Sequence, residues 1–145
     1  MTKEFHFEMS HCLNNYDGLC ANIHGHSYKL FVCLRGEPCQ DSTSSSYGMV
    51  MDFSKLKKIV QKEILDKFDH ALVIEKHSPF IEQIKLTDTK KEIVDFQPTC
   101  ENLVLYIKEK IEPLLPQDVE LFSVKLYETA SSHAEWNLMD VVCDN

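Results

Sequence analysis

Long apolar segments are missing from this chain of 145 residues. No hydrophobic run approaches the ~20 residues that a helix needs to cross the hydrocarbon core of a bilayer. The first six residues, MTKEFH, include no apolar stretch of the kind that a secretory signal peptide contains. These two absences argue against a membrane protein, and we expect a cytoplasmic protein without a membrane partner.

Basic residues are scarce in the sequence. Lysine and arginine total 15 against 23 aspartates and glutamates, which gives a formal net charge of −8. A protein that binds nucleic acid needs a basic face to neutralise the phosphates, so we expect no nucleic-acid partner. A small anionic substrate stays open, because a local pocket can be positive on an acidic protein.

Paired cysteine motifs are also missing. The six cysteines form no Cys-x-x-Cys pair, and the chain is longer than the small secreted proteins that disulfides hold together. We therefore expect free thiols in a reducing compartment. The length and the hydrophobic fraction of 43% suffice for one domain with a buried core, which we take to span residues 1–145.

Alternation of apolar and polar residues predicts four strands. In the first strand Phe5, Phe7 and Met9 alternate with polar residues on the way to His11. The same pattern predicts the other three strands at residues 24–36, 119–127 and 135–142.

Helical spacing of apolar residues predicts two helices, at residues 53–67 and 100–112. Asp52 and Thr99 stand just before them, where a side-chain oxygen can accept a free backbone N–H of the first turn. The segment 75–96 is polar and mixed, and we assign no regular structure to it.

The order of these elements is strand, strand, helix, helix, strand, strand. It predicts an α+β fold, in which a four-stranded antiparallel sheet carries both helices on one face. A sheet this small leaves its edge strands exposed, so we also expect the chain to form an oligomer.

The sequence His24-Gly25-His26 is the strongest chemical signal. Side chains at i and i+2 of a strand point to the same face, so both imidazoles can reach one ion. His11, at the end of the first strand, can supply a third nitrogen. Three imidazoles with one open position form a common catalytic zinc site, whereas structural zinc sites close all four positions. We therefore predict a Zn²⁺ site.

Cys20, four residues before His24, has two possible roles. As a fourth ligand it would close a structural His3Cys site. As a free thiolate beside the metal, stabilised by a nearby cation, it would act as a base or nucleophile. The residues alone leave both roles open.

Other polar residues are weaker candidates when each is taken alone. A histidine oriented by a carboxylate is a common proton shuttle, and Asp69 and His70 are such a pair. Glu128, at the end of a predicted strand, could bind the amidine-like edge of a heterocycle by two parallel hydrogen bonds, but its position also fits an ordinary exposed glutamate. The helix dipole explains Glu101 in the first turn of the second helix.

Six segments together resemble the 6-pyruvoyl-tetrahydropterin synthase / 6-carboxy-tetrahydropterin synthase family. They follow the family's order along nearly the whole chain, at residues 7–11 (FEMSH), 20–28 (CANIHGHSY), 48–53 (GMVMDF), 68–70 (FDH), 98–102 (PTCEN) and 127–129 (YET). The resemblance implies the tunnelling fold (T-fold). It also implies a homohexamer of two trimers with active sites at the subunit contacts, where Asp69 and His70 would serve the Cys20 of a neighbouring chain.

The resemblance also implies roles for single residues. Cys20 matches the family's catalytic thiol, and Asp69 with His70 matches its acid/base pair. Glu128 matches the residue that anchors the pterin ring. The positions that match the zinc ligands are His11, His24 and His26, and those that match the pocket-lining motif are Thr99 and Glu101.

The short Cys-x3-His-Gly-His spacing is similar to the carboxy-forming branch of the family. Two departures stand out: Phe68 replaces the usual leucine before Asp-His, and segment 75–96 is longer than in compact members.

The implied activity is a lyase reaction of queuosine and other 7-deazapurine synthesis. It converts 7,8-dihydroneopterin triphosphate to 6-carboxy-5,6,7,8-tetrahydropterin, acetaldehyde and triphosphate. One alternative is formation of 6-pyruvoyl-tetrahydropterin by triphosphate elimination. Two others involve no turnover: a closed His3Cys zinc-binding domain, and a pterin-binding scaffold.

Overall fold

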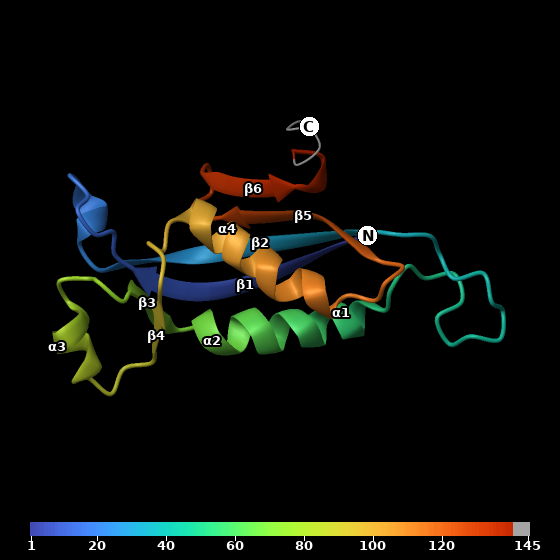
Figure 1. Cartoon of the computed structure of the whole chain (residues 1–145), viewed down its shortest axis with the longest axis horizontal. Coiled ribbons are helices and arrows are strands. Elements are labelled where there is room, and N and C mark those ends of the chain that lie inside the picture. The colour runs from blue at the N-terminus through green and yellow to red at the C-terminus, as the bar shows by residue number, and fades with distance from the viewer. Residues whose placement is uncertain (141–145) are drawn as a thin grey trace.

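A six-stranded mixed sheet forms the centre of the computed structural model, which describes residues 1–140 (Figure 1). The strand order is β4-β3-β1-β2-β5-β6. The α+β class is confirmed. The predicted four-stranded, purely antiparallel sheet is wrong, because β3 and β4 add two parallel strands beside β1. The strands are β1 (Thr2–His11), β2 (His24–Arg35), β3 (Ala71–Glu75), β4 (Lys91–Val94), β5 (Glu120–Tyr127) and β6 (His133–Asn137).

Four of these strands are the ones that the alternation predicts. β1 pairs antiparallel with β2, β2 with β5, and β5 with β6. The last strand begins earlier than predicted and ends at Asn137. Residues 138–140 then form a helical turn, so the prediction of a strand over 135–142 is wrong there. Residues 141 and 142 of the predicted strand lie outside the described part of the chain.

The sequence reading missed β3 and β4 for opposite reasons. In β3 the residues Ala71–Ile74 are all buried, and a strand buried on both faces shows a continuous apolar run rather than alternation. β4 is a short edge strand with Lys91 and Glu92 among its four residues. Parallel strands need a crossover connection, and the chain with α3 (Ile81–Lys85) provides it between β3 and β4. Segment 75–96 is therefore partly regular.

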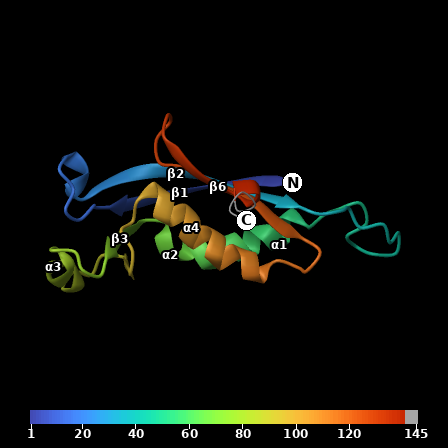
Figure 2. The ribbon, with the colours of Figure 1, turned by 45° about the horizontal axis from the view of Figure 1, so that its top comes forward.

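The two predicted helices are present and lie on one face of the sheet (Figure 2). The first runs without a break through α1 (Phe53–Val60), a π-helical turn (Gln61–Leu65) and α2 (Asp66–Phe68). The second is α4 (Cys100–Ile111). Short 3₁₀ turns occur at Leu19–Ala21 and Glu112–Leu114.

Both predicted N-caps are confirmed. Asp52 Oδ1 accepts the backbone N–H of Ser54 at 2.7 Å, and this bond lowers the pKa of the Asp52 carboxyl. Thr99 Oγ1 accepts the backbone N–H of Asn102 at 3.3 Å. The Thr99 cap fixes where α4 begins, and the cap therefore places residues 99–101 next to the end of the sheet that carries the histidines.

The core lies between the sheet and the two long helices. Alternate residues of β1, β2 and β5 point into it, and the apolar stripes of α1 and α4 cover them. Among the described residues, no helix is both long and apolar enough to cross a membrane. Fully buried side chains from β2, β5 and the two helices include Leu30, Val32, Leu56, Val60, Leu103, Ile107, Ile111, Val124 and Leu126.

The packing of α4 against the sheet can be tested with one substitution on each of its faces. Ile107 is 0% exposed, so Ile107→Ala should lower the free energy of unfolding by about 2–5 kcal/mol through lost burial and a cavity. Leu105 is 47% exposed, and Leu105→Ala should change it by less than about 0.5 kcal/mol. Urea denaturation at one fixed protein concentration measures both. Equal losses would contradict the assigned buried face.

Candidate metal centre and active site

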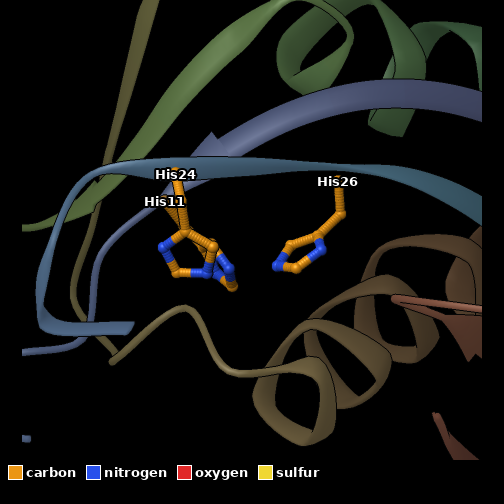
Figure 3. Close-up of side chains that lie close together, drawn as sticks. All are labelled: His11, His24 and His26. Atoms are coloured by element: carbon orange, nitrogen blue, oxygen red, sulfur yellow. The ribbon is translucent and has the colours of Figure 1, made fainter. Parts of the chain in front are cut away.

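Three histidines gather at one end of the sheet and point to its helix-covered face (Figure 3). His24 and His26 come from β2, and His11, the last residue of β1, lies directly opposite His24 in the register. One nitrogen of each ring lies within 4.8 Å of the others. The predicted grouping of these residues is confirmed. The set is called the histidine triad below.

Gly25 allows the two strands to approach closely between the two β2 histidines. A Cβ atom at this position would lie 3.2 Å from the backbone oxygen of Met9, tighter than an ordinary contact. The glycine of His-Gly-His therefore serves the pairing of β1 with β2, and through that pairing the geometry of the triad.

Backbone carbonyls orient two of the rings. His11 Nδ1 lies 2.6 Å from the oxygen of Pro98, and His24 Nδ1 lies 2.8 Å from the oxygen of Asn22. A carbonyl can only accept, so each Nδ1 carries the proton and donates it. Such a bond leaves Nε2 with a free lone pair, which is how metal-binding histidines are commonly held.

The Nε2 atoms of the triad lack partners. All three are buried, and within residues 1–140 none of them has a hydrogen-bond partner. Buried polar atoms are normally satisfied, so three unpartnered nitrogens around one point fit a bound cation. Imidazole nitrogens suit zinc, and the donor set therefore fits the predicted ion.

Burial keeps His11 in the form that a metal requires. The side chain is 2% exposed. Burial lowers the pKa of the His11 imidazole, against smaller opposite effects of the bond to the Pro98 carbonyl and of the Glu128 charge. A neutral ring coordinates a metal, whereas a protonated ring repels it.

A cavity of about 240 Å³ lies beside the triad. Besides His11, four predicted site residues line it: Cys20 from the 3₁₀ turn between β1 and β2, Thr99 and Glu101 from the start of α4, and Glu128 just after β5. His11 forms part of the wall. The fold thus brings a thiol, two carboxylates and one metal-ligand candidate to a single cavity.

Glu128 borders both the cavity and the triad. Its Oε1 atom lies 3.5 Å from His11 Nε2 and 3.9 Å from His26 Nε2. The buried hydroxyl of Tyr28 donates to the same oxygen at 3.3 Å. Burial and the Glu128 charge both raise the pKa of Tyr28, so this hydroxyl keeps its proton.

The Asp69–His70 pair lies outside the cavity that Cys20 and Glu128 line. Asp69 Oδ1 is 2.9 Å from His70 Nδ1 and also accepts the backbone N–H of Glu8 at 2.9 Å. His70 is 77% exposed and lines a separate cavity of about 360 Å³, formed by β1, β2 and the start of β3. Within the described chain this pair does not line the cavity of Cys20.

The backbone at His70 is unusual. Its φ of +58° lies in the left-handed region, which costs a residue other than glycine of order 1 kcal/mol. The N–H of His70 donates to the oxygen of Glu8 at 2.6 Å and so ties this conformation to β1.

The sequence reading missed several residues at the site. Tyr28 continues the i, i+2 series of His24 and His26, and that spacing could have indicated it. Cys100 lines the cavity between Thr99 and Glu101; burial raises the pKa of its thiol to about 11, and the sulfur lies 3.2 Å from the backbone oxygen of Leu126. No local pattern marks the other wall residues, which are Leu13, Tyr16, Ser132 and His133.

Comparison with known proteins agrees with this fold. The family model described as 6-pyruvoyl tetrahydropterin synthase matches residues 1–138. The chain therefore belongs to the 6-pyruvoyl tetrahydropterin synthase family.

Individual relatives of the chain carry two names. The 6-carboxy-5,6,7,8-tetrahydropterin synthase of Haemophilus influenzae is 35% identical over 94% of this chain and 96% of its own length. The 6-pyruvoyl tetrahydrobiopterin synthase of Pongo abelii is 33% identical over 77% of this chain and 66% of its own. The solved 6-pyruvoyl tetrahydropterin synthase of Caenorhabditis elegans shares the fold, with a TM-score of 0.65 and 29% identity over 94% of this chain and 93% of that one.

Metal binding by the triad can be tested by zinc content. We expect about one zinc ion per chain in the wild type, and His24→Ala should weaken binding by more than about tenfold through loss of a ligand. His6→Ala is the matched control, because His6 lies on β1 but on the opposite face, 62% exposed. Elemental analysis after dialysis measures both variants. Equal zinc in the wild type and His24→Ala would reject the site.

Proposed function

We propose that this chain is a zinc-dependent 6-carboxy-5,6,7,8-tetrahydropterin synthase. It converts 7,8-dihydroneopterin triphosphate and water to 6-carboxytetrahydropterin, acetaldehyde and triphosphate, a lyase reaction of queuosine and other 7-deazapurine synthesis. The observation that carries the proposal is the buried triad of orphan imidazole nitrogens beside a cavity lined by Cys20 and Glu128. The 35% identity to the Haemophilus influenzae protein of that name supports the carboxy-forming product. The match of the family model to residues 1–138 supports one domain over 1–145.

The triad would hold the zinc ion through its three Nε2 atoms. When bound, zinc supplies Lewis-acid polarisation of a substrate oxygen. The carbonyls of Pro98 and Asn22 keep the rings in the required tautomer, and the burial of His11 keeps its ring neutral. The chain's own contribution is a set of three imidazoles brought together by β1 and β2, two of them oriented by backbone carbonyls.

The cavity beside the triad would hold the pterin. A carboxylate can accept two parallel hydrogen bonds from an amidine-like edge, and Glu128 would anchor the ring in this way. Thr99 and Glu101 line the same cavity and would fix the orientation of the ring. This arrangement would place the substrate side chain between the metal position and Cys20, where the thiolate accepts a proton.

The second proton-transfer group would come from another subunit. In one chain His70, paired with Asp69, lines a cavity different from that of Cys20. We infer that the chain forms a homohexamer of two trimers, with active sites at subunit contacts. There the exposed His70 of one chain, oriented by its Asp69, faces the Cys20 of the next and transfers protons on the other side of the substrate.

The identity of the product separates the two enzymatic alternatives. Formation of 6-pyruvoyl-tetrahydropterin stops at triphosphate elimination and internal rearrangement. The 33% identity to the Pongo abelii protein supports this alternative. Incubation of the zinc-loaded protein with 7,8-dihydroneopterin triphosphate, followed by mass spectrometry, should show 6-carboxytetrahydropterin and acetaldehyde in equal amounts. A pyruvoyl product without acetaldehyde would reject the carboxy-forming assignment.

Cys20 decides between an enzyme and a closed zinc-binding domain. Cys20→Ala should keep the zinc content of the wild type and abolish triphosphate release, because the thiol acts on the substrate and is not a ligand. Cys33→Ala, on β2 away from the cavity, is the matched control and should keep both. A loss of zinc in Cys20→Ala as large as in His24→Ala would instead make the sulfur a fourth ligand.

His70 can be tested without disturbing its backbone. Asparagine tolerates the left-handed conformation but cannot transfer a proton at neutral pH, so His70→Asn should keep the thermal stability. We expect kcat to fall by about 10²–10⁴-fold, the usual contribution of a general acid or base. His77→Asn, in the connection after β3, serves as control. Turnover of His70→Asn at the wild-type rate would remove His70 from the mechanism.

A further inference from the structure

Tyr28 is a fully buried polar side chain beneath the triad. It is 0% exposed and follows His26 on the same face of β2. Its ring stacks on Phe7, with centroids 5.1 Å apart and planes 8° from parallel. The edge of the ring contacts His26, with centroids 5.7 Å apart. The ring is therefore held on two sides and has little freedom to move.

The hydroxyl of Tyr28 is aimed at Glu128. The two oxygens are 3.3 Å apart, and a carboxylate can only accept, so Tyr28 donates. The accepting atom, Oε1, is the same atom that lies near His11 Nε2 and His26 Nε2. The Tyr28 hydroxyl, held in the core, thus donates to Glu128, whose carboxylate borders both the triad and the cavity.

We propose that Tyr28 is a positioning residue that holds the Glu128 carboxylate in the orientation needed to bind the pterin ring. The inference rests on the role of Glu128 in the proposed function and deepens it. Tyr28 does not touch the cavity itself, so its effect on the substrate passes through Glu128.

The backbone of Glu128 is fixed separately. Its N–H donates to the oxygen of Ser132 at 3.1 Å, within the turn that links β5 to β6. With the backbone fixed, the side-chain torsions remain to be set, and the bond from Tyr28 restricts them. A carboxylate oxygen has two lone pairs, so Oε1 can accept from Tyr28 and from a ligand N–H together. Preorganisation of this kind lowers the entropic cost of binding the ligand.

A simpler explanation is that Glu128 only satisfies a buried hydroxyl, since a tyrosine in a core needs a partner. In that case loss of the hydroxyl changes stability and leaves pterin affinity unaltered. The two explanations therefore differ in whether loss of the Tyr28 hydroxyl changes the affinity for the pterin.

The test compares Tyr28→Phe, Glu128→Ala and the double variant in the zinc-loaded, full-length protein. Titration with neopterin, followed by pterin fluorescence, gives Kd, and turnover of 7,8-dihydroneopterin triphosphate gives KM and kcat. Loss of a bond to a charged group should raise Kd and KM of Tyr28→Phe by roughly tenfold. We expect kcat to change less, and zinc content to stay that of the wild type. Tyr106→Phe, whose ring packs on Phe68 and Phe96, is the control and should change none of these.

The double variant distinguishes positioning from independent support of the fold. If Tyr28 acts through Glu128, the double variant binds neopterin as weakly as Glu128→Ala alone. Multiplied effects, an unchanged Kd in Tyr28→Phe, or zinc loss in that variant would each overturn the inference. Absence of both neopterin binding and turnover in the wild type would instead reject the proposed function.

Discussion

The pairing of β1 with β2 determines the site, because it sets His11 opposite His24 and points three imidazoles at one place. Side chains alternate along a strand, so a slip of one residue would turn His11 to the opposite face. The buried residues that oppose such a slip include Phe5, Phe7 and Met9 on β1 and Leu30 and Val32 on β2. The hydrophobic core and the histidine triad therefore depend on the same register.

Residues from distant parts of the chain complete the site that the pairing of β1 with β2 begins. The carbonyl of Pro98, just before α4, orients His11, and the Thr99 cap fixes the start of the helix that carries Glu101. Glu128 reaches the same cavity from the end of β5. β1, α4 and β5 thus meet at one end of the sheet. Backbone carbonyls that make no sheet hydrogen bond, such as that of Pro98, can accept hydrogen bonds from side chains there.

The separation of Asp69 and His70 from Cys20 is as informative as the clustering of the other residues. The pair is tied to β1 through Glu8, and the exposed His70 lines a cavity that Cys20 does not line. If both cavities belong to the proposed active site, assembly would have a catalytic purpose beyond the covering of sheet edges. In the proposed hexamer the fold and the reaction would thus depend on the same contacts.

The sequence by itself determined the local features: the alternation of four strands, the two long helices, the Asp52 and Thr99 caps and the facing imidazoles of His24 and His26. Each follows from periodicity or spacing within a few residues. The tertiary structure decided the parallel addition of β3 and β4, the contact of Tyr28 with Glu128, and the placement of His70 and Cys20 in different cavities. These depend on pairing between segments far apart in the chain, which a buried run such as Ala71–Ile74 does not specify, because burial on both faces erases the alternation.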